Sequence, residues 1–117
     1  MTSTRNNIFK KVNTEMKLII KKYSIFQVKM KAMEYFRGKE EANTSEQCKT
    51  YKNYISYIDL ILDTMRPEES EIIKKIYIQK VSLNDLGYSQ TCVYRHLTSA
   101  IQSFLELFDR NICQQYM

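Results

Sequence analysis

The chain has 117 residues, enough for one domain with a modest hydrophobic core. Its composition, with 44% hydrophobic and 26% charged residues, is typical of a globular protein. No apolar run approaches the ~20 residues of a membrane-spanning helix, and the N-terminus lacks the apolar core of a signal peptide. We therefore expect a cytoplasmic protein with no membrane contact. Two glycines and one proline favour an all-α fold, and three widely spaced cysteines favour free thiols over a disulfide framework or a metal site.

The net charge of +5 is unevenly distributed along the chain. Residues 1–42 carry ten Lys or Arg against four acidic residues, whereas residues 43–81 are balanced at six each and residues 82–117 carry two against three. We therefore divide the chain into a long basic N-terminal helix, 1–42, and a helical domain, 43–117. Because phosphate contacts supply most non-specific affinity for nucleic acid, the basic segment would hold the backbone of any bound DNA.

The first predicted element is a helix over residues 6–36, which contain no Gly or Pro. Its apolar residues alternate spacings of three and four, as in a heptad seam: Phe9, Val12, Met16, Ile19, Tyr23, Phe26, Met30 and Met33. A continuous helix would be ~45 Å long, against a radius of gyration of ~13 Å for a compact domain. Such a helix overhangs its domain, breaks near Tyr23 and Ser24, or pairs with a second chain in a homodimer.

Three further predictions concern the middle of the chain. Gly38 ends the first helix, and residues 39–43 are expected to form a loop. Thr44 and Gln47 have the spacing of a capping box, which would begin a helix over residues 45–65. Pro67 then interrupts the chain and begins a helix over residues 67–80, since proline suits the first helical turn.

The C-terminal part predicts a helix-turn-helix over residues 82–108. A short helical turn at 82–86 ends at Gly87, which can adopt the left-handed conformation, and Ser89 caps a second helix over 89–108. One face of this second helix is apolar and is expected to be buried: Val93, Leu97, Ala100, Ile101, Phe104, Leu105 and Phe108. The opposite face of its first turns is polar, as in a helix that reads DNA bases. We therefore expect about five helices in all.

The C-terminal half of the chain carries a set of residues at the places of a known motif: Pro67, Glu68, Glu69, Ile72, Ile73, Tyr77, Ser82, Leu83, Gly87, Tyr88, Ser89, Val93, Tyr94, Arg95, Ala100 and Phe104. Through these residues it resembles region four of sigma factors and the related phage late-gene activators of the ArpU and RinA kind. Between Ser82 and Gly87 this chain is about one helical turn shorter than that pattern. The resemblance implies a DNA-binding transcription regulator, and it also implies docking on RNA polymerase.

The residues expected to contact double-stranded DNA follow from the position of the second helix. Its first turns offer base-reading or phosphate-binding groups: Ser89, Gln90, Thr91, Tyr94 and Arg95. Gln can pair with adenine and Arg with guanine in the major groove. Lys17 and Lys21 of the basic N-terminal helix are expected to contact the phosphate backbone. For Tyr94, as for Tyr88, packing is an equally good interpretation.

Other candidate sites have simpler explanations. The lone His96 has no nucleophile at catalytic spacing, and Glu68 and Glu69 suit the positive end of a helix, so we expect neither an enzyme nor a cofactor or metal site. Three tyrosines fall on the apolar faces of predicted helices and are expected to fill the core: Tyr51, Tyr54 and Tyr77. The alternative function is a protein-interaction module that docks on RNA polymerase or another helical partner without binding DNA by itself.

Overall fold

The computed structural model describes residues 2–87 and 89–113, with side chains given for 7–83, 85–87, 89 and 91–112. Over these residues the chain is helical and contains no strand, which confirms the predicted all-α fold. The helical elements, in chain order, are α1 (Thr2–Arg37), α2 (Lys39–Thr44), α3 (Glu46–Thr64), α4 (Pro67–Ile73), η1 (Lys74–Ile78), η2 (Leu83–Leu86), α5 (Gln90–Leu107) and α6 (Arg110–Cys113). None of the described helices is long and apolar enough to cross a membrane.

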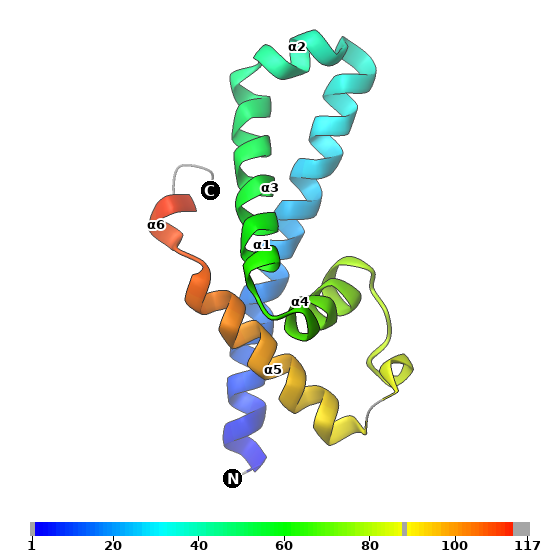
Figure 1. Ribbon diagram of the computed structural model, residues 1–117, viewed down its shortest axis with the longest axis vertical. Helices are drawn as coiled ribbons and strands as arrows, with labels where there is room; N and C mark the ends of the chain where they lie inside the picture. The colour runs from blue at the N-terminus through cyan, green and yellow to red at the C-terminus, as the bar shows by residue number, and fades with distance from the viewer. Residues whose placement is uncertain (1, 88, 114–117) are drawn as a thin grey trace.

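Helix α1 is the spine of the molecule and runs without a break through Tyr23 and Ser24. It begins four residues before the predicted start. Its 36 residues match the longest dimension of the molecule, 53 Å, and the radius of gyration of 16.2 Å exceeds the ~13 Å of a compact domain. Figure 1 shows the reason: α3 runs back along one end of α1, α2 joins them at the far end, and α4 and α5 lie against the other end. The molecule is therefore elongated along α1, which is covered by different helices at its two ends.

The predicted heptad seam of α1 packs against other helices of the same chain. Met16, Tyr23 and Phe26 are buried, and the other seam residues pack against the same core. The Phe26 ring lies 4.7 Å from the ring of Tyr51 and 5.3 Å from that of Tyr54, measured between centroids, so the seam meets the inner face of α3. A second chain could occupy this seam only by displacing α3.

Tyrosine hydroxyls link elements that are far apart in the sequence. Three buried tyrosines keep their hydroxyls hydrogen-bonded, which avoids the cost of an unpaired buried hydroxyl. The bonds are Tyr23 to Asp59 Oδ1 at 2.6 Å, Tyr54 to the Ile19 carbonyl at 3.3 Å, and Tyr77 to Asn13 Oδ1 at 2.5 Å. Tyr51, Tyr54 and Tyr77 are all buried, which confirms their predicted place in the core.

The predicted loop at 39–43 is wrong, because these residues form α2. Gly38 has a φ of 88°, so it ends α1 as predicted, but the next turn is again helical. Ala42 is buried and anchors this short helix. The predicted capping box is also wrong: the Thr44 hydroxyl bonds the Glu40 carbonyl within α2, and Ser45 caps α3 by accepting from the Cys48 N–H at 3.3 Å.

The helix predicted over 67–80 is divided. After α4 the backbone widens into a π-helical turn, η1, in which the Gln79 N–H bonds the Lys74 carbonyl five residues back at 2.8 Å. Lys80 then adopts a φ of 60°, a conformation uncommon for a residue with a side chain. The chain thereby leaves the helix axis and turns toward η2. Sequence periodicity cannot anticipate this turn, since the apolar spacing itself continues.

A first prediction tests the phase of α5. Val93 is only 1% exposed, so Val93→Asp should lower the melting temperature sharply, because an unpaired buried charge costs several kcal/mol. The matched control is Cys92→Asp at the neighbouring exposed position, which should leave the melting temperature nearly unchanged. Thermal unfolding followed by circular dichroism compares the two, and similar melting curves would show that Val93 lies on the surface.

A second prediction concerns alkaline pH. Burial raises the pKa of Tyr77 well above its ordinary value, so the folded protein keeps a proton that the unfolded chain loses above about pH 10. Stability should therefore fall above this pH, by at most ~1.4 kcal/mol per pH unit for each such group. At pH 7 the Tyr77→Phe variant should be less stable than wild type, because it lacks the hydrogen bond to Asn13. Between pH 10 and 11.5, however, the variant should lose less stability than wild type does.

Urea unfolding at each pH measures this difference. Tyr23 offers an independent repeat, because burial and the hydrogen bond to Asp59 raise its pKa in the same direction. Parallel curves of stability against pH for wild type and Tyr77→Phe would contradict the linkage.

Candidate nucleic-acid interface

Helix α5 begins with the cap that the sequence predicts. Gly87 has a φ of 80° and turns the chain, and the Ser89 hydroxyl accepts a hydrogen bond from the Cys92 N–H at 3.3 Å. The element before this turn, η2, is a single four-residue 3₁₀ turn, closed by the Asp85 N–H on the Ser82 carbonyl at 3.0 Å. The first helix of the motif is therefore as abbreviated as its sequence suggests.

The inner face of α5 fixes the helix to the rest of the molecule. Five of its residues are at most 1% exposed: Val93, Leu97, Ala100, Ile101 and Phe104. The Ser103 hydroxyl donates to Glu69 Oε2 at 2.7 Å and ties α5 to α4. Glu69 therefore has a structural partner. Figure 1 shows α5 crossing α1 with α4 alongside, so the helix is held from two sides.

The outer face of α5 is polar and exposed. Thr91, Arg95, Ser99 and Gln102 lie on it at intervals of three and four residues, all of them exposed. Arg95 is the only Lys or Arg of this helix, although Thr91 and Ser89 add hydroxyl groups at its positive N-terminal end. Such a face can donate to phosphate oxygens or to base edges. The side chain of Gln90, and Tyr88 altogether, lie outside the described residues.

Tyr94 lies at the boundary between the inner and outer faces. Its ring packs edge-to-face on Phe9 of α1, with ring centroids 5.0 Å apart and planes at 83°, and 37% of the residue stays exposed. This contact places the first turns of α5 beside the first turns of α1. Sequence reasoning missed it, because nothing in the spacing of either helix identifies a partner more than eighty residues away.

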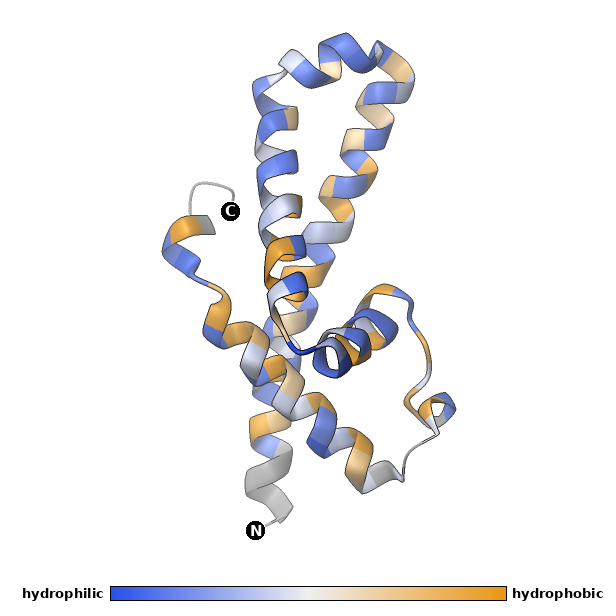
Figure 2. Cartoon of the chain, in the orientation of Figure 1, coloured by the Kyte–Doolittle hydropathy of each residue, from blue (hydrophilic) through white to orange (hydrophobic). Residues whose placement is uncertain are grey.

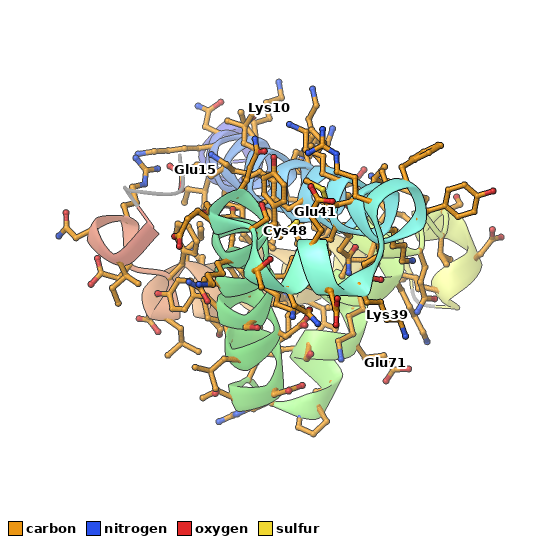
Figure 3. The ribbon with its side chains drawn as sticks, turned by 90° about the horizontal axis from the view of Figure 1, so that it is seen from above. Lys10, Glu15, Lys39, Glu41, Cys48 and Glu71 are labelled. Atoms are coloured by element: carbon orange, nitrogen blue, oxygen red, sulfur yellow. The ribbon has the colours of Figure 1, made fainter. Side chains whose placement is uncertain are left out.

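Lys17 and Lys21 are exposed on α1, each directly following a buried residue, Met16 and Ile20. They lie about 12 and 18 Å along the helix axis from Phe9, at 1.5 Å per residue. Figure 3 shows Lys10, the next residue after Phe9, pointing outward from α1 on the side away from α3 and α4. Among the described side chains, the predicted site residues thus form two groups, one on α5 and one on α1.

No metal site is evident in the described part of the chain, where no three His, Cys, Asp or Glu side chains gather closely enough to hold an ion. Glu68 and Glu69 occupy the first turn of α4, after Pro67, where acidic side chains suit the helix dipole. Cys48 is buried in the core and Cys92 is exposed on α5.

Comparisons of this chain with models of protein families, with curated proteins and with solved structures found no match.

Proposed function

We propose that this protein binds double-stranded DNA through the N-terminal turns of α5 and regulates transcription, as the resemblance to sigma region four implies. The observation that carries the proposal is the two-faced character of α5. Five residues of its apolar face, from Val93 to Phe104, are at most 1% exposed, and its capped N-terminal end presents a polar, exposed face. A recognition helix needs both properties, since it must be rigidly held while its first turns reach the major groove.

The proposed contacts divide between base edges and backbone. Gln90, Thr91 and Arg95 face base edges, where Gln pairs with adenine and Arg with guanine. Tyr94 contributes its exposed edge to a thymine methyl group or a phosphate, while its other edge rests on Phe9. Ser89, Lys17 and Lys21 contact phosphates.

A second candidate function is supported by the charge of α5. Arg95 is its only Lys or Arg, and residues 82–117 carry two basic against three acidic residues. A nearly neutral polar helix suits protein docking, and RNA polymerase is the partner that the resemblance suggests. The two functions differ in salt dependence, because DNA binding through phosphates weakens steeply with salt, while a helix–helix contact does not.

A third prediction tests base reading. After selection of a preferred duplex from a random pool, Arg95→Ala should reduce discrimination against mismatched duplexes by about tenfold or more, since a good base contact contributes ~1–3 kcal/mol. Gln90→Ala should behave similarly. The matched control is Ser99→Ala, one turn further along the same exposed face, which should bind like wild type. Binding is measured by fluorescence anisotropy with labelled duplexes, after circular dichroism confirms the fold of each variant.

The double variant Lys17→Ala/Lys21→Ala should weaken binding to all duplexes alike. It should also flatten the plot of log affinity against log salt by about 0.9 for each lost phosphate contact, because fewer counterions are released. If selection enriches no sequence and wild type binds no duplex in a salt-dependent way, the DNA proposal fails and protein docking becomes the leading function.

A further inference from the structure

A second apolar stripe runs along the outer side of α1, opposite the seam that packs on α3. Its large apolar members are all exposed: Leu18 by 65%, Ile25 by 40%, Val28 by 67% and Tyr35 by 83%. With Lys21 and the exposed Ala32 between them, these residues alternate spacings of three and four over about two and a half heptads. We call these six residues the outer stripe. Scattered exposed leucines need no explanation, but a periodic row on one helix marks an interaction surface.

Two of the lysines next to the outer stripe, Lys22 and Lys29, bend away from it toward α3. The Lys22 ammonium lies 5.6 Å from the ring centre of Phe26 and 5.9 Å from that of Tyr54. The Lys29 ammonium lies 5.7 Å from the ring centre of Tyr51. These cation–π contacts hold both ammonium groups at the boundary between α1 and α3. Lys21 is then the one cation inside the outer stripe, and Lys17 and Lys31 are exposed on the same helix.

The charge of α1 argues against a second copy of this chain as the occupant. The helix has nine basic and two acidic residues, a net charge of +7. Neither acidic residue belongs to the outer stripe. Glu15 forms an ion pair of 3.4 Å with Arg110 of α6, and Glu34 is half-buried. Two copies paired along this surface would bring like charges together and leave Lys21 without a counter-ion, which is unfavourable. The complementary partner is acidic.

The periodicity decides what kind of acidic partner fits. From Leu18 to Tyr35 the outer stripe covers ~26 Å of helix axis, the length of a short coiled-coil partner. Duplex DNA would leave four large apolar side chains without apolar contact. A membrane surface would force Lys21, which lies between Leu18 and Ile25 in the stripe, toward the acyl chains, where a charge is costly. A partner helix can place a carboxylate opposite Lys21 and apolar side chains opposite the rest.

We propose that the outer stripe of α1 is a docking surface for an amphipathic helix of another protein, one whose apolar face is bordered by Glu or Asp side chains. This inference goes beyond DNA binding and does not depend on it. Lys21 is the one residue that both proposals use. Ile25 and Val28 belong to the docking surface alone, so their variants separate the two activities.

The probe is a synthetic three-heptad helical peptide with Leu and Ile on its apolar face and Glu at the flanking positions. Its matched control carries Lys in place of every Glu. The full-length protein should bind the Glu peptide at least about tenfold more tightly than the Lys peptide, and the preference should shrink as salt rises. Fluorescence anisotropy with labelled peptides measures both affinities.

The double variant Ile25→Gln/Val28→Gln should weaken binding of the Glu peptide by about tenfold or more, since it removes two apolar anchors. It should leave the melting temperature and duplex binding as in wild type, because both positions are exposed. The matched control is Leu60→Gln on α3, whose exposure of 61% lies between those of Ile25 and Val28, and which should bind the Glu peptide normally. Lys21→Glu should shift the preference toward the Lys peptide.

Several outcomes would overturn the proposal. Equal binding of both peptides, or no binding of the Glu peptide, would show that charge complementarity does not define the partner. A dimer in sedimentation that becomes a monomer in Ile25→Gln/Val28→Gln would identify a second copy as the occupant. Tighter binding to phosphatidylserine vesicles than to the Glu peptide, lost in the same variant, would identify a lipid surface. If the wild-type protein binds the Glu peptide but no duplex DNA, the DNA proposal alone is contradicted.

Discussion

The packing of α1 on α3 is the interaction on which the rest of the structure depends. The inner seam of α1 has no role without the aromatic face of α3, because Phe26 lies between the rings of Tyr51 and Tyr54. Each large buried side chain contributes ~1.5–3 kcal/mol through burial, so a row of them outweighs any single polar contact in the molecule. The cation–π contacts of Lys22 and Lys29 seal the edge of the same interface.

The position of α5 depends on its packing against α1. In the N-terminal half of α1, Phe9 contacts Tyr94 and Asn13 accepts a hydrogen bond from Tyr77. One side of the helix therefore orients both α5 and the π-helical turn before it. The other end of α5 is held by Tyr57, whose hydroxyl donates to the Leu107 carbonyl at 3.3 Å and accepts from the Asp109 N–H at 2.8 Å. The polar face of α5 is therefore positioned by contacts at both ends of the helix.

Local patterns predicted most of the fold, and for physical reasons. The Ser89 cap, the turn at Gly87 and the burial of Val93 each depend on a few neighbouring residues, so they can be found in the sequence alone. Helix α2 was not predicted, because its six mostly polar residues contain no apolar residues at helical spacing. The π-helical turn was missed because it changes backbone bonding without changing the apolar spacing.

The candidate site was predictable only in part. Its α5 residues follow from helix phase, whereas the contact of Tyr94 with Phe9 depends on how distant helices pack. The two apolar stripes of α1 show the same limit more clearly. Figure 2 shows apolar residues recurring along this helix, and hydropathy alone does not tell which of them the chain itself covers. Figure 1 supplies that information, because α3 lies along only one side of α1.

The continuous α1 also imposes an order on folding. Residues 2–64 form a helical hairpin, α1–α2–α3, whose contacts are local enough to close early as the chain leaves the ribosome. The N-terminal half of α1 pairs with η1 and α5, which follow it by more than sixty residues in the chain, so Phe9 and Asn13 are covered only after these later elements have been made. Until then, Phe9 and the outer stripe leave apolar surface uncovered on both sides of one basic helix.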